Sequence, residues 1–194
     1  MAEVELPDPE ALEAARDKTF SRRVALTTAV YAVVLAIASL GGNNAMKEML
    51  LAQQEASNQW SYYQAKVIRE HLNRGNKMVL EAQLAEPSAL EGAGRRKFEG
   101  LARTFADEEK RMNADKKEIE PRARAAEAVR DLNQARDPYF DYAEVLLQIA
   151  IVTASVSILS ASRPTFWISL GLAAIGAVFA ANGFFLLVRL PFLH

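Results

Sequence analysis

The way charge is distributed along this chain constrains its fold more than any other feature. Residues 24–42 and 166–188 form two blocks without a charged side chain, each close to the roughly 20 residues that a helix needs to cross a bilayer. Arg22 and Arg23 precede the first block, and Arg189 follows the last one. Both blocks are therefore predicted to be transmembrane helices.

A third block, residues 142–162, is less clear because it contains Glu144, Gln148 and several hydroxyl side chains. Only the short segment 163–165, which includes a proline, separates it from the last block. Such a segment predicts a tight turn between two antiparallel helices. We therefore expect residues 142–162 to be a further transmembrane helix.

Between the first and second predicted spans lies a polar segment, residues 43–141, that is predicted to form a long helical hairpin. Its first part has no proline and is rich in helix-forming residues. Proline and glycine then gather within residues 87–94, where we expect the turn. Residues 1–23 and 189–194 are left as terminal tails. The expected fold is an all-α membrane protein with three transmembrane helices and an antiparallel coiled-coil-like hairpin between the first and second.

Both arms of this hairpin carry an apolar stripe with the three-four spacing of a coiled-coil seam. In the first arm the stripe comprises Met46, Met49, Ala56, Trp60, Tyr63 and Val67, with Gln53 as a polar interruption. In the second arm it comprises Phe98, Phe105, Met112, Ile119 and Ala126, with Leu101 and Val129 at intermediate positions. Three further positions of the second stripe are charged, namely Glu108, Asp115 and Arg122. The arms are expected to pair along a partly polar seam.

Two prolines predict interruptions of the second arm. Pro121 is expected either to kink the helix or to start a fresh one. Asp137, which precedes Pro138, is expected to cap a new helix that leads directly into the second span.

Composition narrows the classes of function. A net charge of -1 argues against binding to nucleic acid, because neutralising phosphates requires a surplus of Lys and Arg. The chain contains no cysteine, which excludes a disulfide, a thiolate metal site and a thiol nucleophile. No paired groups suited to acid-base or nucleophilic chemistry are recognisable, so we expect neither an enzyme nor a cofactor.

The cations that flank the spans bear on orientation. On the side of the N-terminus they are Lys18, Arg22, Arg23 and Arg163, and on the side of the hairpin they are Lys47, Arg130, Arg136 and Arg189. Long loops count little in this comparison, so we expect a cytoplasmic N-terminus and a periplasmic hairpin in a bacterial inner membrane. Residues 21–23 also resemble the start of a twin-arginine secretion signal, but the acidic stretch before them favours a retained anchor.

Four polar residues within the predicted spans form a candidate intramembrane site: Glu144, Gln148, Ser155 and Asn182. One interpretation is proton or ion handling along the face that carries Glu144 and Gln148. The other, which we favour, is an interfacial carboxylate, because Glu144 lies at the edge of its span and not at the centre. Asn182 is expected to hydrogen-bond across a helix interface.

Small residues recur along the third span at spacings that let helices approach closely. They are Ala173, Gly176, Ala177, Ala180, Ala181 and Gly183. The pattern predicts packing, either among the spans of one chain or between identical chains. In the hairpin, the aromatic residues Trp60, Tyr63, Phe98 and Phe105 are predicted to pack the arms or to form a surface for a partner.

The stretches Arg22–Leu26, Ala38–Asn43 and Ala52–Lys66 resemble a family of bacterial membrane proteins described only as domain of unknown function 4337. The resemblance extends over nearly the full length. It implies a multi-pass membrane protein with a helical middle region, and it implies no activity.

The expected function is that of a non-enzymatic membrane scaffold that homo-oligomerises and presents its hairpin to a protein partner. The alternative is a channel or ion-handling subunit in which Glu144 and Gln148 face a pathway. A third possibility is an extracytoplasmic sensor, whose output would require a separate signalling protein because the tail before Arg22 is short. The expected partners are the lipid bilayer and further copies of the chain.

Overall fold

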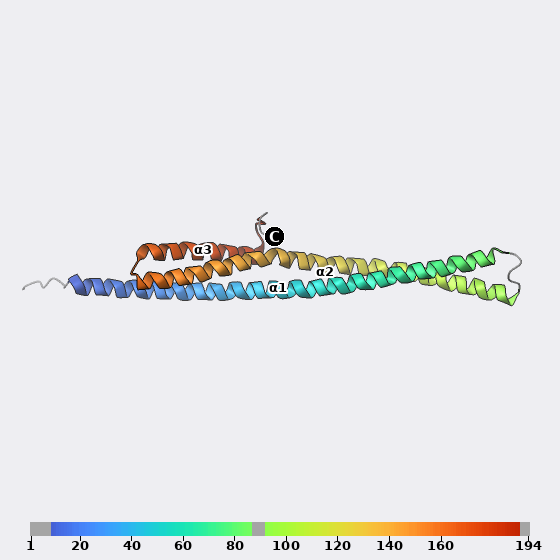
Figure 1. Ribbon diagram of the computed structural model, residues 1–194, viewed down its shortest axis with the longest axis horizontal. Helices are drawn as coiled ribbons and strands as arrows, with labels where there is room; N and C mark the ends of the chain where they lie inside the picture. Colours follow the sequence, from blue (N-terminus) through green and yellow to red (C-terminus); the bar gives the residue numbers. More distant parts are fainter. Residues whose placement is uncertain (1–8, 87–91, 191–194) are drawn as a thin grey trace, which may run out of the picture. The chain divides into compact units, whose positions relative to one another are not determined.

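The computed structural model describes residues 9–86 and 92–190, with side chains described from residue 17 onward. These residues form three α-helices: α1 (Pro9–Leu84), α2 (Ala93–Leu159) and α3 (Arg163–Phe185) (Figure 1). No strand occurs within the described ranges. The prediction of an all-helical chain is therefore confirmed.

All three helices contain a stretch that is long and apolar enough to cross a membrane. Only 22% of the apolar window of α1, and 28% of those of α2 and α3, is buried within the chain. Large apolar side chains such as Val33, Val152 and Val178 are instead exposed. Such surfaces are unusual in water and ordinary in contact with lipid.

The chain divides into two compact units. The first comprises Met1–Glu48 and Leu132–His194, and the second comprises Met49–Asp131. The first unit holds the apolar stretches, and the second holds most of the predicted hairpin.

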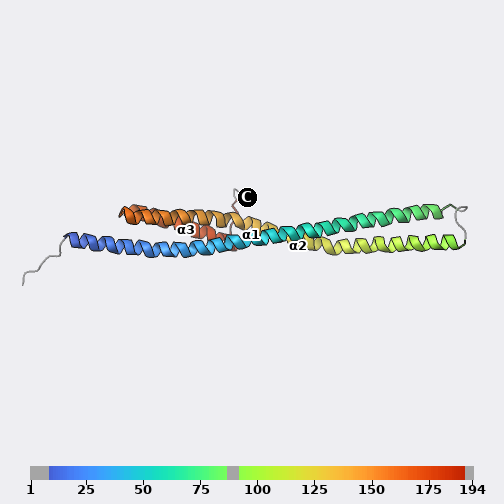
Figure 2. The ribbon, with the colours of Figure 1, turned by 60° about the horizontal axis from the view of Figure 1, so that its bottom comes forward.

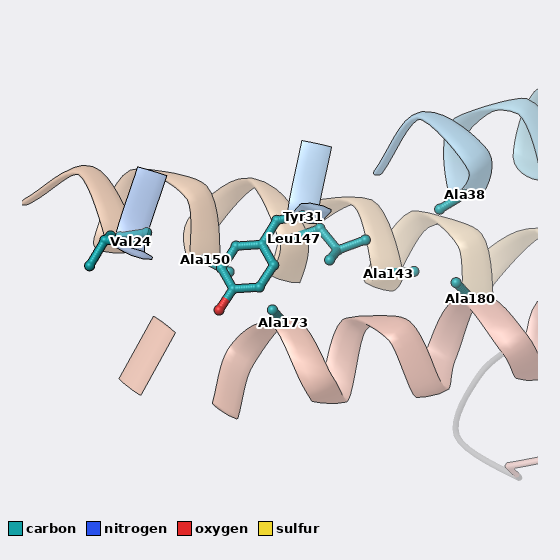
Figure 3. Packing of buried hydrophobic residues seen from close by; sticks show 9 residues of the cluster. Val24, Tyr31, Ala38, Ala143, Leu147, Ala150, Ala173 and Ala180 are labelled. Carbon is teal, nitrogen blue, oxygen red and sulfur yellow. The ribbon is translucent and has the colours of Figure 1, made fainter. Parts of the chain in front are cut away.

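In the first unit, α3 lies alongside α2 (Figure 2), and rows of small residues make the contact. The buried residues of α3 recur every three or four positions: Ser169, Ala173, Gly176, Ala180 and Gly183. Ala173 and Ala180 belong to an apolar core to which α1 contributes Val24, Tyr31 and Ala38 and α2 contributes Ala143, Leu147, Ala150 and Ala154 (Figure 3). Small side chains at this spacing let helix backbones approach closely.

Phe140 of α2, which is 2% exposed, fits into a socket that is made of glycines. A Cβ atom added at Gly41 would lie 2.5 Å from Phe140 Cε1, and one at Gly183 would lie 2.9 Å from the same atom. At Gly42 the corresponding distance to Phe140 Cβ is 3.1 Å. The Phe184 ring packs edge-to-face on Phe140 with centroids 4.9 Å apart. The glycines of α1 and α3 are thus required for the space that Phe140 occupies.

No fresh helix starts within the second arm, so that alternative at Pro121 and the predicted helix start at Asp137 are wrong. α2 continues through Pro121 and through Asp137, so Asp137 is not a helix cap. Ile119 and Ala123 on either side of Pro121 are buried. The packing of these neighbours outweighs the loss of one backbone hydrogen bond at a proline.

The turn between α2 and α3 lies earlier than predicted. α2 ends at Leu159, Ala161 has a left-handed φ of 47°, and Ser162 precedes the first turn of α3. The segment 163–165 is therefore helical, and its proline occupies an early helical position, where a missing N–H leaves no hydrogen bond unmade. α3 also ends before the predicted boundary, at Phe185.

The hairpin turn falls partly outside the described residues. α1 ends at Leu84, and α2 begins at Ala93 after Gly92, whose φ is 60°. Pro87 and Ser88, on which the predicted turn rested, lie outside the described ranges.

The face that α1 turns toward α2 in the second unit differs in part from the predicted stripe. Its buried and half-buried three-four row is Met49, Ala52, Ala56, Gln59, Tyr63, Lys66, Glu70, Asn73, Lys77, Leu80 and Leu84. Met49, Ala56 and Tyr63 are common to both rows, and the predicted Trp60 and Val67 are half-buried beside them, but Gln53 is exposed and Ala52 takes its place. Met46, in the first unit, is 45% exposed. Ala52 and Ala56, at 8% and 2% exposed, are the most buried apolar residues of this row.

A similar one-residue shift occurs on α2. The predicted heptad positions are buried or half-buried: Phe98, Phe105, Met112, Ile119 and Ala126. Leu101 and Val129 are 41% and 47% exposed, and Arg122 is also exposed, whereas the predicted charged positions Glu108 and Asp115 are half-buried. The intermediate positions of the row are instead Ala102, Glu109, Lys116, Ala123 and Arg130.

Candidate functional site: the polar seam of the hairpin

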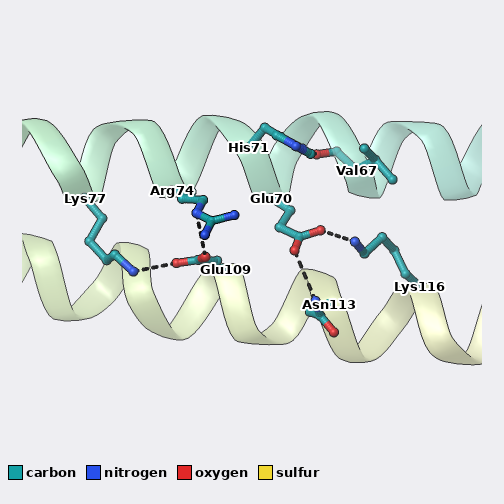
Figure 4. A network of polar contacts seen from close by, with 8 residues as sticks. All are labelled: Val67, Glu70, His71, Arg74, Lys77, Glu109, Asn113 and Lys116. Atoms are coloured by element: carbon teal, nitrogen blue, oxygen red, sulfur yellow. Dashed lines mark hydrogen bonds and ion pairs between the residues drawn. The ribbon is translucent and has the colours of Figure 1, made fainter.

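Side chains of opposite charge face one another where α1 and α2 meet in the second unit (Figure 4). We call this row the polar seam and define it by Lys66, Glu70 and Lys77 of α1 and Glu109, Asn113, Asp115 and Lys116 of α2. The α2 partners have lower numbers as the α1 numbers rise, so these parts of the two helices run antiparallel.

Lys66 is the most buried charged group of the seam, with a side chain that is 8% exposed. Its Nζ donates a hydrogen bond of 2.6 Å to Asp115 Oδ2. This bond raises the pKa of Lys66 despite the opposing effect of burial, and it lowers the pKa of Asp115. The ammonium group also lies 5.1 Å from the centroid of the Tyr62 ring. The pair is held in its charged form.

Glu70 forms the middle of the seam. It accepts a hydrogen bond of 3.1 Å from Asn113 Nδ2 and pairs with Lys116 Nζ. The hydrogen bond with Lys116, assisted by that with Asn113, lowers the pKa of Glu70 against the effect of burial. Further along, Lys77 Nζ donates to Glu109 Oε2 at 2.7 Å. Each of these charges therefore has a partner of opposite sign on the other arm.

Two of the predicted aromatic residues lie beside this seam. Trp60 Nε1 donates a hydrogen bond of 2.9 Å to Glu127 Oε1, and its ring packs edge-to-face on Tyr63 with centroids 5.5 Å apart. Phe98 and Phe105 are half-buried. The Trp60–Glu127 bond joins the two arms.

The seam has the chemistry of a structural contact between the arms, because each of its acids, Glu70, Glu109 and Asp115, is paired with a cation. Within the described ranges, no three His, Asp or Glu side chains gather in a way that could hold a metal ion. Lys66, Glu70 and Lys77 were not predicted from the sequence to face the other arm. Their three-four spacing was the signal, but a periodicity of charged residues is usually that of an exposed face.

The structure does not bring the predicted intramembrane polar residues into one site. Glu144 is half-buried, with Oε1 3.6 Å from the position of a Cβ at Gly42. Gln148 and Ser155 are exposed, and the Ser155 hydroxyl donates to the Ile151 carbonyl of its own helix. One chain therefore does not assemble a polar pathway from these side chains.

Asn182 does not hydrogen-bond across a helix interface, as had been expected. Its Nδ2 donates to the Val188 carbonyl at 2.7 Å, and its Oδ1 accepts from Val188 N–H at 2.9 Å. Both bonds satisfy backbone groups that follow the end of α3. Tyr139 of α2 assists, because its hydroxyl donates to the same carbonyl and accepts from Leu190 N–H.

The small residues of α3 are divided between the interior and the surface. Ala173, Gly176, Ala180 and Gly183 are buried against the chain's own helices. Because intramolecular packing occupies these four, they are not available to a second chain. Ala177 is half-buried, and Ala181 is exposed at the wall of an apolar cavity of about 300 Å³ beside Tyr139 and Phe179.

A second, smaller cavity of about 110 Å³ lies in the first unit beside Phe140. Its polar lining consists of Asn44, Glu48, Asn133 and Arg136. The Arg136 Nε atom is buried and has no hydrogen-bond partner among the described residues. From the sequence, Arg136 was predicted only to flank a span, because nothing in the pattern shows which helices enclose it.

Comparison with known families places the chain. A family model with the description "Domain of unknown function (DUF4337)" matches residues 20–186. The chain belongs to the DUF4337 family. The match begins just before the first apolar block and ends just after α3, so it includes both units. No curated protein and no solved structure matches the chain. Membership of the DUF4337 family carries no assigned activity.

Proposed function

We propose that this DUF4337 protein is a non-enzymatic membrane scaffold, which homo-oligomerises and presents its helical hairpin to a protein partner. The observation that carries the proposal is the contrast between the two units. The first exposes long apolar stretches on three helices, whereas the second pairs its arms through ion pairs that water tolerates. A lipid-embedded anchor and a water-exposed hairpin account for both surfaces.

The polar seam supports a structural role for the hairpin. Its acids are paired with cations of the other arm, which engages the groups that acid-base catalysis would use. Ion pairs between arms also fix which residues face one another. The hairpin is then a defined surface that a partner can recognise.

The proposed location is the bacterial inner membrane, with a cytoplasmic N-terminus and a periplasmic hairpin. Arg22 and Arg23 directly before the first span, together with Arg163 between the other two, support this orientation under the positive-inside rule.

Half-burial of Glu144 is the one observation that favours the alternative, an ion-handling subunit, although its place at the edge of the span favours an interfacial carboxylate. In this alternative several chains would be needed to line a pathway, because Gln148 and Ser155 face outward. Ion flux into liposomes that contain the purified protein separates the two proposals. A flux that Glu144→Gln abolishes would favour the channel, and the scaffold predicts no flux from either protein.

The mass of the purified protein in lipid nanodiscs tests the scaffold proposal. We expect a defined multiple of the 21.4 kDa chain at working concentrations. A homogeneous monomer would contradict the homo-oligomeric part of the proposal.

A further inference from the structure

A second three-four row runs along α1 in the hairpin, and it is exposed and apolar. We call it the outer seam and define it by Ala65, Ile68, Leu72, Gly75, Val79 and Ala82. Ile68, Leu72 and Val79 are 68%, 61% and 59% exposed. All six belong to the second unit and lie beyond the predicted spans, so lipid does not account for their exposure.

Over this stretch the charged face of α1 packs on the neighbouring helix and the apolar face is exposed, which is the reverse of an ordinary amphipathic helix. Its face toward α2 carries Lys66, Glu70 and Lys77, whereas Ile68 and Leu72 lie two positions further along the chain. Two positions correspond to about 200° around a helix of 3.6 residues per turn, so the apolar row points away from α2. Helices of globular proteins turn such a row toward a partner.

Gly75, in the middle of the outer seam, also indicates that a partner helix packs on this row. Nothing lies within 4 Å of a Cβ atom added there, so no contact inside the chain requires a glycine. In a helix interior glycine is less favourable than alanine by about 1 kcal/mol. A glycine here would, however, let the backbone of a second helix approach closely.

We propose that the outer seam is a dimerisation surface, on which the α1 arms of two identical chains pair in parallel and in register. The inference rests on the proposed membrane anchoring. Two chains inserted in one bilayer project their hairpins to the same side, which makes their α1 arms parallel and raises their effective concentration. In register, Ile68 faces Ile68 and Leu72 faces Leu72 of the two copies.

The charges beside the outer seam are compatible with this pairing. No seam residue between Ala65 and Ala82 is charged. In a parallel coiled coil, the residue just before every second core position, here Ala65, Leu72 and Val79, lies at the edge of the seam. It faces the residue that is five positions later in the sequence of the other chain. These flanking pairs are Gln64 with Arg69, His71 with Asn76, and Met78 with Gln83. None of them places like charges together at neutral pH, so a second copy is accepted without repulsion.

Disulfide cross-linking of the full-length chain tests the proposal directly, because the protein has no cysteine of its own. Single variants Ile68→Cys, Leu72→Cys and Val79→Cys are oxidised in native membranes and separated without reductant. A disulfide requires Cα atoms about 4.4–6.8 Å apart, which paired seam positions satisfy. We expect conversion of most of each variant to a covalent dimer. Glu81→Cys, exposed on the same helix but off the seam, is the matched control and is expected to stay monomeric.

A charge swap tests the register. Leu72→Lys and Leu72→Glu, each combined with Val79→Cys, are expected to lose the dimer when expressed alone. Co-expression of the two, with tags of different size, is expected to restore a mixed dimer. Circular dichroism of each variant checks that the helices remain folded.

Absence of dimers at all three seam positions, or equal cross-linking of Glu81→Cys, would overturn the proposal. Cross-linking of the seam only to a different protein would overturn it as well. Membrane fractionation of the same samples tests the anchoring separately, since the cross-linking pattern is read in whichever fraction holds the protein.

Discussion

Phe140 and the glycines around it show how single residues set the distance between helices. A methyl group at Gly41 would collide with the Phe140 ring, and that ring is nearly fully buried. The ring cannot move aside without displacing Phe184, on which it packs. Residues without a side chain are therefore as important to this unit as its aromatic rings.

We predict that Gly41→Ala destabilises the protein. Overpacking of a tight site typically costs about 1–3 kcal/mol, and the clash at 2.5 Å lies with a buried ring. Gly171→Ala is the matched control, because nothing lies within 4 Å of the added Cβ and alanine is the better helix former. Thermal unfolding in detergent, followed by circular dichroism, compares the two. Equal melting temperatures for Gly41→Ala and the natural protein would show that the socket is not tight.

The polar seam makes the helical hairpin sensitive to pH. The pKa values of Glu70 and Asp115 are lowered, so their contribution is complete above the unfolded-state values and is lost as pH falls through the folded-state values. The pKa of Lys66 is raised, so its contribution is complete below the unfolded-state value and is lost as pH rises through the folded-state value. Hairpin stability is therefore expected to be greatest between about pH 4.3 and about pH 10.4 and to decline on both sides.

Trp60 fluorescence in a Trp167→Phe background reports on the hairpin during denaturation at each pH. In the double variant Lys66→Gln and Asp115→Asn, hairpin stability is expected to fall less steeply at both acid and alkaline pH. The control is the ion pair of Arg95 and Glu99, whose side chains are 46% and 44% exposed. Replacing both residues with glutamine is expected to have little effect on hairpin stability at any pH. An unchanged pH profile in the Lys66 variant would mean that the pair does not stabilise the arms.

The helical elements could be predicted from the sequence, but their contacts could be predicted only in part. Uncharged blocks of membrane length identify helices reliably because few other structures tolerate them. A three-four spacing leaves two adjacent rows possible: the predicted stripe contained Met46 and Gln53, which are exposed, whereas the neighbouring Ala45 and Ala52 are buried. The pairing of Lys66 with Asp115 depends on the register of the opposite arm, which no local pattern encodes. The role of Asn182 depends on the path of the backbone after the end of α3, which composition does not predict.

At the scale of the whole molecule, one chain combines two units with opposite surface chemistry. Apolar side chains of the first unit face outward along three helices. In the second unit, charges are paired between the arms and an apolar row remains free on α1. A protein in this arrangement is expected to be held in a bilayer and to meet its partners through the hairpin.

The central claim is that three spans place the hairpin and the α2–α3 turn on opposite sides of a membrane. Labelling of single cysteines with a membrane-impermeant maleimide tests it most directly, with Gln54→Cys in the hairpin and Ser160→Cys in the turn, both at exposed positions. In intact spheroplasts we predict that Gln54→Cys is labelled and that Ser160→Cys is labelled only after permeabilisation. Labelling of both from the same side, or recovery of the protein in the soluble fraction, would contradict the account.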